Sequence, residues 1–349
     1  MDASLVRRVL MPVTAAVCAV ALFGGCTGSP KESASPQSAA PKAANDLEAD
    51  YQKVIRNVLP SVVQIQAGDS IGSGVVYDDK GHVVTNAHVV GAEKSFNVTV
   101  ATGELELTAQ LVSSYPDQEL AVIKLDKVPQ GLKAARLGDS SKVEVGQIVL
   151  AMGTPLGLSS SVTQGIVSAV GRTVSEGEGG GGTGATISNM VQTSAAINPG
   201  NSGGALVNLD SELIGIPTLE AVDPGLGGVA PGIGFAIPVS TVKSIADQII
   251  KDGRVTHSGR AALGITARTV LDDSYQPSGV AVVSVAKGGP AQQAGIRPGD
   301  IITKLGSTEI TSVMSLAEAL ASASPGEKVA VTYLRGGEEG RVEVTLGEA

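Results

Sequence analysis

Short strand-like runs, each separated from the next by Gly, Asp, Asn or Pro, recur along the chain between residues 50 and 254. No long helical pattern lies between them, so the alternating strand–helix units of a parallel sheet are excluded. The runs instead predict antiparallel barrels or a sandwich, preceded by a short helix that ends at Pro60 and closed by a helix near 241–252. The clearest runs cover 62–66, 73–77, 82–86, 97–101, 105–113, 120–125, 148–152, 165–170, 204–208, 212–216 and 234–238.

The composition agrees with a β-rich protein of about two domains, given 349 residues and roughly 150 residues per domain. Hydrophobic residues make up 42% of the chain, which is enough for a buried core. Aromatic residues make up only 2%, so Val, Ala, Ile and Leu must fill that core. The 45 glycines favour a loop-rich β architecture over a helical bundle.

Charge and motifs exclude several classes of function. The formal charge is −9 and no basic run interrupts the sequence, which argues against nucleic acid as a partner. The two cysteines, Cys18 and Cys26, lie near the N-terminus, so neither a disulfide framework nor a cysteine metal site is expected. A His-Glu-x-x-His motif and a phosphate-binding glycine loop are also missing from the sequence. We therefore expect neither a metal nor a cofactor.

The N-terminal segment is typical of an export signal. Arg7 and Arg8 precede an apolar run over 9–23, and small residues lead up to Cys26. The run is too short for a membrane-spanning helix, which needs about 20 apolar residues. A cysteine in this position resembles the lipidation motif of bacterial lipoproteins. We expect residues 1–25 to be a signal peptide and Cys26 to carry lipid, with an uncleaved signal anchor or an unmodified cysteine as the alternatives.

Residues 26–49 would then connect the lipid to the folded protein. The segment 27–46 is a mixture of Ser, Pro, Ala, Lys and Gly without a hydrophobic period. Such a composition cannot bury a core and is typical of a flexible tether. The expected location is the extracytoplasmic face of a bacterial cell envelope, with the membrane contacted through the lipid anchor.

Three later segments carry side chains suited to nucleophilic catalysis, and the first contains His88. It is one of only three histidines and follows closely on the apolar run 82–86. An imidazole titrates near neutral pH, so it can take a proton from a hydroxyl and return it to a leaving amine. Taken alone, a hydrogen-bonded core histidine is the simpler interpretation.

The second segment holds two carboxylates, Asp117 and Glu119, before the apolar run 120–125. An acid at this point can orient a histidine and stabilise its cation. In isolation, a solvated charge at the end of a strand explains either residue equally well.

The third segment, 198–204, surrounds Ser202 with glycines. Glycine neighbours allow a sharp turn that exposes the hydroxyl, and they let successive N–H groups converge on a developing oxyanion. An ordinary tight glycine turn is the alternative for this segment alone.

Together, the three segments follow the chain order histidine, acid, serine of chymotrypsin-like proteases. They resemble the HtrA/Deg serine proteases, which are trypsin-like proteases with C-terminal PDZ domains. The segments that carry this resemblance are 85–90, 119–125, 153–157, 162–168, 195–205 and 232–238. The resemblance implies a mostly β fold, with a chymotrypsin-like double β-barrel over 50–255 followed by a small α+β PDZ domain over 259–347.

The resemblance also implies the roles of the site residues. His88 would act as general base and then general acid, Ser202 would be the nucleophile, and the N–H groups of Gly200 and Ser202 would form the oxyanion hole. Where the family has Asp, this chain has Glu119, whose extra methylene moves the carboxylate by about 1.5 Å. We expect Glu119 to be the acid, with Asp117, taken to lie on the same strand face, as the alternative.

The C-terminal region resembles a PDZ domain through its segment 290–302 and through 262–265, which matches the carboxylate-binding loop. Backbone N–H groups of Leu263, Gly264 and Ile265 would hold a peptide C-terminus while the peptide adds a strand to the sheet edge. A small module without a ligand is the alternative. We expect strands over 264–268, 280–285, 300–305, 329–335 and 341–346 around one helical stretch, 315–321.

The leading hypothesis is a serine endopeptidase of envelope quality control and stress response, which degrades unfolded or misfolded proteins and recognises peptide C-termini. A catalytically weak, lipid-anchored chaperone or PDZ scaffold is the alternative, and only Glu119 favours it. A purely structural lipoprotein would leave both glycine motifs unexplained. The family often forms trimers through aromatic residues near the protease N-terminus. Only Tyr51 is available here, so the resemblance implies a homo-oligomer without fixing its order.

Overall fold

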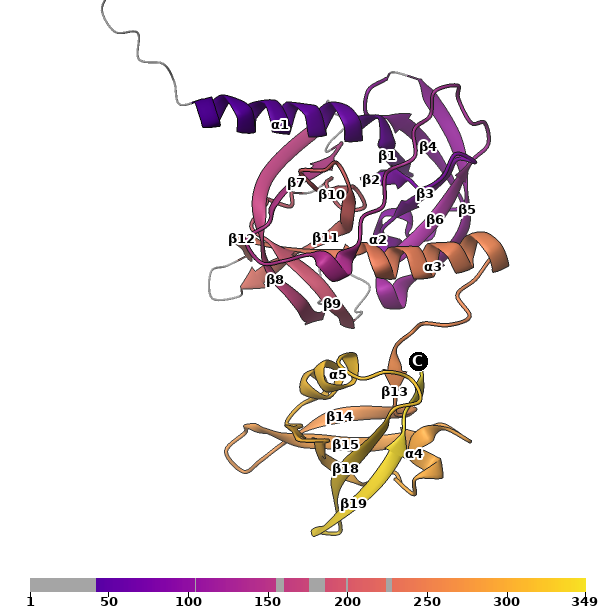
Figure 1. Ribbon diagram of the computed structural model, residues 1–349. Coiled ribbons are helices and arrows are strands. Elements are labelled where there is room, and N and C mark those ends of the chain that lie inside the picture. The colour runs from indigo at the N-terminus through magenta and orange to yellow at the C-terminus, as the bar shows by residue number, and fades with distance from the viewer. Residues whose placement is uncertain (1–41, 104, 155–159, 176–185, 199, 224–227) are drawn as a thin grey trace, which may run out of the picture. The chain divides into compact units, whose positions relative to one another are not determined.

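The computed structural model describes residues 42–349 except for 104, 155–159, 176–185, 199 and 224–227 (Figure 1). The predicted signal peptide, Cys26 and the tether as far as residue 41 therefore lie outside the described residues. So does the glycine-rich stretch 176–184, which the sequence predicts to be a mobile surface loop. All of these remain predictions.

The first barrel closes on itself without a free edge, as the short strand-like runs predict. Its strands are β1 (Val62–Ala67), β2 (Ser70–Val76), β3 (His82–Thr85), β4 (Ser95–Val100), β5 (Glu106–Tyr115) and β6 (Leu120–Leu125). They pair in the order β1-β2-β3-β6-β5-β4. Two short helical segments interrupt the connections: α2 (Ala87–Val90) follows β3, and the 3₁₀ helix η2 (Pro116–Gln118) precedes β6. His88 lies on the first of these segments, and Glu119 directly follows the second.

The second barrel has the same size and a matching strand order. Its strands are β7 (Ile148–Gly153), β8 (Ser161–Ser175), β9 (Thr186–Thr193), β10 (Ala205–Asn208), β11 (Leu213–Asp223) and β12 (Gly228–Pro238), and a 3₁₀ turn, η3 (Ser140–Lys142), precedes them. They close in the order β10-β11-β12-β9-β8-β7. The prediction of antiparallel barrels is confirmed. Strand β9 is not among the predicted runs, because Asn189 adopts a left-handed conformation (φ 59°) that breaks the alternation of buried and exposed residues.

Two longer helices flank the barrels, α1 (Lys42–Val58) with its 3₁₀ extension η1 (Leu59–Ser61), and α3 (Val239–Asp252). Helix α3 confirms the helix expected near 241–252. Helix α1 begins at Lys42, inside the range expected to be tether. The apolar pattern misses this start because the buried contacts of α1, at Val54 and Val58, lie in its C-terminal half.

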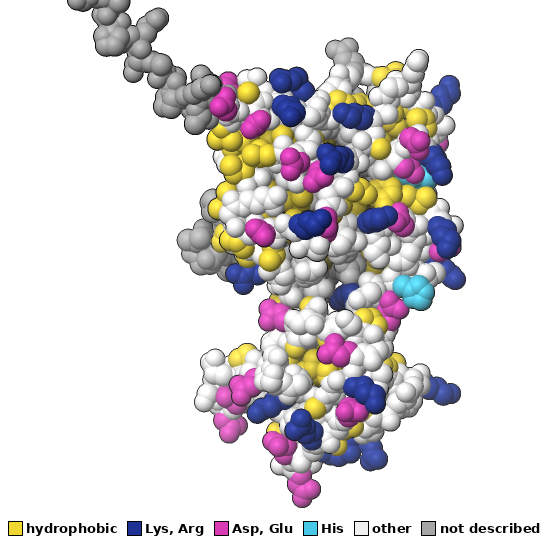
Figure 2. Space-filling view, viewed as in Figure 1, with side chains coloured by type: hydrophobic (Ala, Val, Ile, Leu, Met, Phe, Trp, Pro, Cys, Tyr) yellow, Lys and Arg dark blue, Asp and Glu magenta, His cyan; other side chains and the backbone are white. Residues whose placement is uncertain are grey.

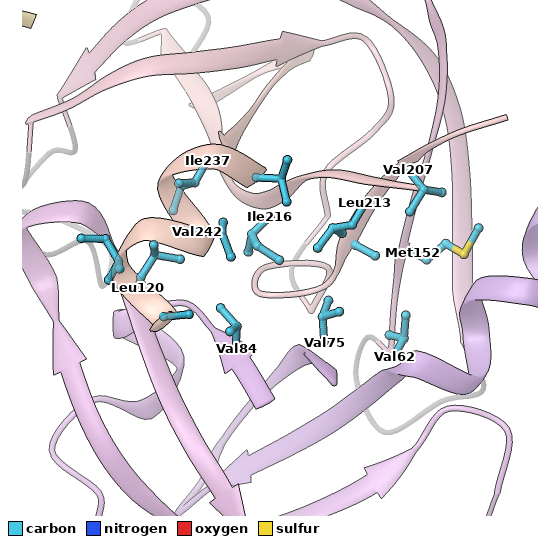
Figure 3. Close-up of a cluster of buried hydrophobic side chains, with 14 of the residues drawn as sticks. Val62, Val75, Val84, Leu120, Met152, Val207, Leu213, Ile216, Ile237 and Val242 are labelled. Carbon is cyan, nitrogen blue, oxygen red and sulfur yellow. The ribbon is translucent and has the colours of Figure 1, made fainter. Parts of the chain in front are cut away.

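The two barrels share one hydrophobic core, which fixes their relative position. Val75 and Val84 of the first barrel lie opposite Leu213 and Ile216 of the second, and Val242 of α3 lies beside Ile216 (Figure 3). All five side chains are almost fully buried. Burying a side chain of this size stabilises the fold by about 1.5–3 kcal/mol. Loops that project from the two barrels are therefore held in fixed positions relative to each other.

The C-terminal domain has a separate hydrophobic core and a six-stranded sheet. Its elements are β13 (Ala261–Ala262), β14 (Ile265–Leu271), β15 (Pro277–Val285), α4 (Pro290–Gln293), β16 (Ile301–Leu305), β17 (Thr308–Glu309), α5 (Val313–Ala321), β18 (Lys328–Arg335), β19 (Glu338–Thr345) and β20 (Gly347–Glu348). The five predicted strands and the helix are present. The expectation of a single helix is wrong, because α4 has only four residues and thus no apolar period to read.

The surface mixes charges of both signs. On the face shown in Figure 2, lysine and arginine side chains alternate with aspartate and glutamate rather than gathering by sign. Among the described residues, no group of three or more His, Cys, Asp or Glu side chains is placed to hold a metal ion. The same part of the chain contains no helix with the length and apolarity that a membrane crossing requires.

Candidate active site

His88 and Glu119, which lie on two connections of the first barrel, contact each other although 31 positions separate them. His88 lies on α2, and its ring Nδ1 is 2.5 Å from Glu119 Oε1. The same oxygen accepts the His88 backbone N–H at 2.8 Å. Because a carboxylate can only accept, Nδ1 must carry the proton, which leaves the lone pair on Nε2. The histidine is thereby set up as a base.

The backbone of Glu119 explains how a glutamate fits this position. Glu119 adopts the left-handed conformation (φ 54°, ψ 36°), which is costly for a residue with a Cβ. Its N–H donates to Pro116 O at 2.9 Å, and its carbonyl accepts from Asn86 Nδ2 at 2.9 Å and from Ala87 N at 3.2 Å. These three bonds hold a sharp turn between η2 and β6. The turn sets the fully buried carboxylate against α2.

Asp117 lies elsewhere. It is exposed and belongs to η2, so the expectation that Asp117 and Glu119 share one face of a strand is wrong. Pro116 fixes the start of the 3₁₀ turn and thereby prevents the strand from extending back over Asp117. Of the two carboxylates, only that of Glu119 contacts His88.

Ser202 lies on a tight turn of the second barrel, between left-handed Gly200 (φ 101°) and Gly203 (φ 81°). A Cβ on Gly203 would lie 2.4 Å from Thr85 Oγ1 and 3.2 Å from Asn86 N, so only glycine fits. This close approach brings the turn against the residues that lead into α2. The half-buried Ser202 hydroxyl donates to the Thr218 carbonyl at 3.3 Å.

The turn also prepares two N–H groups for an anion. Asn201 N donates to Asn198 O at 2.9 Å, and Gly200, just before Asn201, has a positive φ of 101°. Among the described residues, the N–H groups of Gly200 and Ser202 have no acceptor. They are therefore available to a developing oxyanion, where such a donor is worth about 3–4 kcal/mol.

The predicted carboxylate-binding loop lies between β13 and β14. Gly264 has a positive φ of 69°, and the carbonyls of Leu263 and Gly264 accept from Ala291 N and Ala286 N. Within the described ranges, the N–H groups of Leu263 and Gly264 have no acceptor. Ile265 opens β14, which is the edge strand of its sheet. The loop thus offers free donors beside an edge to which a peptide strand can add.

Ser73, a fully buried serine of β2, contacts the Ser202 turn and is not among the site residues predicted from the sequence. Its sequence signal is the run Gly72-Ser73-Gly74 inside an apolar strand. A polar residue between glycines in a buried strand indicates close approach by another backbone.

Two family models match the chain, a trypsin-like peptidase domain over residues 72–216 and a PDZ domain over residues 261–346. The serine protease PepD of Mycobacterium tuberculosis is 38% identical over 331 residues, which cover 89% of this chain and 69% of PepD. The periplasmic pH-dependent serine endoprotease DegQ of Escherichia coli is 36% identical, with 86% of this chain and 64% of DegQ covered.

Solved structures agree with this assignment. The serine endoprotease from Yersinia pestis aligns with a TM-score of 0.60 at 36% identity, over 86% of this chain and 98% of that one. The HtrA-type protease AlgW, solved with a decapeptide, aligns with a TM-score of 0.61 at 30% identity over 86% and 98% of the two chains. Fold and matches together define a trypsin-like peptidase followed by a PDZ domain. The chain belongs to the HtrA family of serine endopeptidases, as the sequence motifs predict.

Proposed function

We propose that this endopeptidase hydrolyses unfolded or misfolded polypeptides on the extracytoplasmic side of the cell envelope, with Ser202, His88 and Glu119 as its catalytic triad. The observation that carries the proposal is the 2.5 Å contact between His88 Nδ1 and the buried Glu119 carboxylate. It favours His88 as a base, and the glycine turn that carries Ser202 packs against the residues that lead into α2. Geometry of this kind is the arrangement that acyl transfer needs.

The mechanism follows from the atoms in place. His88 Nε2 takes the proton of the Ser202 hydroxyl as Oγ attacks the carbonyl carbon of the scissile bond. The N–H groups of Gly200 and Ser202 receive the negative charge on the former carbonyl oxygen. Glu119 stabilises the imidazolium, which gives its proton to the departing amine. Water, activated by the same histidine, then releases the acyl group from Ser202.

The alternative of a catalytically weak chaperone or PDZ scaffold depends on Glu119 in place of aspartate. The left-handed turn at Glu119 accommodates the longer side chain, and its carboxylate reaches His88. The feature that favours the alternative, glutamate in place of aspartate, is therefore compatible with an acid that contacts the histidine. We therefore favour the protease.

The PDZ domain would recognise the C-termini of substrate proteins. Behind the donors of Leu263 and Gly264, the groove between β14 and α5 is lined by apolar side chains, among them Leu263, Ile265, Leu316 and Leu320. A hydrophobic C-terminal residue fits this lining, and its carboxylate fits the free N–H groups. Misfolded proteins expose such ends, so the proposed ligand agrees with the proposed substrate.

Extracytoplasmic location is supported by the similarity to DegQ, which is a periplasmic endoprotease. The N-terminal motif supports anchoring through lipid on Cys26 as a further part of the proposal. Growth with radiolabelled palmitate should label the wild type and leave Cys26→Ser unlabelled. Equal labelling of both would contradict lipidation at this residue.

Homo-oligomerisation is proposed from the family alone. Tyr51, the single aromatic residue available near the start of the protease domain, is half-buried against the core of its own chain. Light scattering on the purified protein should give a mass above that of one chain, and a monomer at all accessible concentrations would contradict this part of the proposal.

The decisive experiment uses the chain of residues 27–349 with casein as a permanently unfolded substrate. The wild type should cleave casein, and the matched Ser202→Ala protein should not. Cleavage by both would assign the activity to a contaminant. If neither cleaves, even with a hydrophobic C-terminal peptide present, the chaperone or scaffold alternative gains support.

A second experiment tests the PDZ ligand. A peptide with a hydrophobic C-terminal residue should bind the full chain, while the same peptide with an amidated C-terminus should not. Equal binding of the two forms would contradict recognition of the carboxylate by Leu263, Gly264 and Ile265.

A further inference from the structure

Ser73 connects the two barrels at the point where the turn of residues 200–203, which carries Ser202, approaches β2. We call this turn the nucleophile turn. Its hydroxyl donates to Gly200 O at 2.5 Å and accepts the Thr154 N–H at 2.9 Å. Its backbone N–H donates to Ser202 O at 3.0 Å. One residue of the first barrel thus holds two carbonyls of the nucleophile turn, which belongs to the second barrel.

These two carbonyls flank the part of the turn that carries the Ser202 N–H. Gly200 O and Ser202 O belong to the peptide units on either side of the unit that contains this N–H. Fixing both neighbours fixes the plane of the unit between them, because a peptide unit is planar and turns as a whole. Ser73 thereby governs where the Ser202 N–H points, without touching substrate itself.

The surrounding atoms hold the Ser73 side chain in one position. The side chain is fully buried, and a Cβ on Gly153 would lie 2.8 Å from its Oγ. Ser73 O accepts the Thr85 hydroxyl at 2.6 Å, which ties the serine to the end of β3. A hydroxyl that both donates and accepts in such a confined place has one orientation.

We propose that Ser73 is a positioning residue for the hydrolytic reaction, which aligns the oxyanion hole of Gly200 and Ser202 from across the barrel interface. The proposal rests on the proposed function, because it assigns Ser73 a part in that same site. Loss of the Ser73 hydroxyl would leave Gly200 O and the Thr154 N–H without their partner. The turn would then sample orientations in which its N–H groups miss the oxyanion.

The test compares Ser73→Ala with the wild type and with Ser61→Ala, a matched loss of a buried hydroxyl in the same domain. Direct removal of an oxyanion-hole donor costs about 10²–10³ in kcat, so we expect an indirect loss of about 30-fold. The substrate is a quenched fluorescent peptide built on a site cleaved in casein. We expect kcat to fall with KM within about twofold, because an oxyanion hole acts on the transition state.

A transition-state analogue separates positioning from general damage to the fold. A peptide boronic acid, which forms a tetrahedral adduct on Ser202, should bind Ser73→Ala more weakly by about the factor lost from kcat/KM, roughly 30-fold. Ser61→Ala should keep wild-type affinity for the boronic acid. Should Ser73→Ala fail to fold, Ser73→Cys keeps a weak S–H donor, and we expect a loss of kcat of at least about threefold without a change in KM.

Two different results would overturn the account. A wild type that neither cleaves casein nor binds the boronic acid would overturn the proposed function and this inference together. If the wild type is active and Ser73→Ala keeps the same kcat, the role of Ser73 alone is overturned. The same holds if Ser61→Ala loses as much kcat and as much boronic-acid affinity as Ser73→Ala does.

Discussion

The two barrels have the same strand number and yet build their halves of the site in different ways. The first barrel contributes His88 and Glu119, and the contact between the imidazole and the buried carboxylate holds these two side chains together. The second contributes Ser202 on a turn held by backbone hydrogen bonds and by glycines with positive φ. The first half therefore depends on a pair of side chains, whereas the second depends on backbone geometry that the glycines allow and the Ser73 hydroxyl supports.

This difference predicts how each half fails. A substitution in the first half should change the chemistry and leave the fold intact, because a side chain of similar size can replace the carboxylate. A substitution in the second half should disturb the local backbone, because added atoms have no space. The predictions below test that contrast in order of decreasing effect.

The largest effect is expected from Glu119→Gln. The amide would keep the shape of the carboxylate but lose the charge that fixes the His88 tautomer. Turnover should fall by about 10⁴, the size of the loss when the corresponding aspartate of a chymotrypsin-type protease becomes asparagine. Asp117→Asn is the matched control, and its turnover should stay within about twofold of wild type because Asp117 is exposed and away from His88. Casein cleavage measures both, and the reverse ranking would make Asp117 the acid.

Gly203→Ala should lower turnover by about 10³ and also destabilise the turn. The new Cβ would lie 2.2 Å from Ser73 O, and alanine disfavours the φ of 81°. Hydrogen exchange should rise in residues 200–205, in contrast to Glu119→Gln, in which exchange should stay at wild-type rates. A fully active Gly203→Ala protein would contradict the close approach of the two barrels.

Glu119→Asp should cost less, about 10–100-fold in kcat, although it restores the residue that the family usually has. The shorter side chain withdraws the carboxylate from His88 while the left-handed turn stays adapted to glutamate. Peptide hydrolysis with separate kcat and KM measures the change. An increase in kcat would show that the turn adapts to aspartate and that its geometry does not specify glutamate.

The smallest effect on catalysis is expected from Asp300→Asn in the PDZ domain. Asp300 is buried and forms a two-pronged pair with Arg335, at 2.7 and 2.8 Å. The substitution should lower the unfolding free energy of this domain by about 2 kcal/mol. Hydrogen exchange in β16 and β18 should rise, while cleavage of a short peptide should stay within about twofold of wild type.

The same pair predicts a pH dependence. Burial of Asp300 opposes its ionisation, but the hydrogen bonds from Arg335 and the Arg297 N–H outweigh it, so the pKa of Asp300 lies below the ordinary aspartate value. Its stabilising contribution is therefore complete above the pKa of an unfolded aspartate and is lost as the pH falls through the folded pKa. In the wild type, the free energy of unfolding of the PDZ domain should therefore fall as the pH drops through the folded pKa of Asp300, and in Asp300→Asn this part of the fall should be missing. Identical acid profiles would contradict it.

The sequence alone predicts the double barrel and the PDZ domain, and it proposes the residues of the candidate site. Short apolar runs are local signals, so they predict strands well. The position of the Glu119 carboxylate cannot be predicted from such local signals. It depends on the left-handed turn after η2, whose carbonyl accepts hydrogen bonds from Asn86 and Ala87, which lie far away in the sequence. Ser73 escapes sequence reasoning for the same reason, since its partners Gly200 and Thr154 belong to the other barrel.

The central claim is that Glu119 holds the proton of His88 on Nδ1, and nitrogen-15 spectra of labelled histidine test it directly. The chain has three histidines, so His88 can be assigned by comparison with a His88→Gln protein. At a pH where the ring is neutral, the account predicts protonated Nδ1 in the wild type and in Asp117→Asn, and a shift of the proton to Nε2 in Glu119→Gln. Protonated Nδ1 in Glu119→Gln, or its loss in Asp117→Asn, would contradict the assignment of the acid.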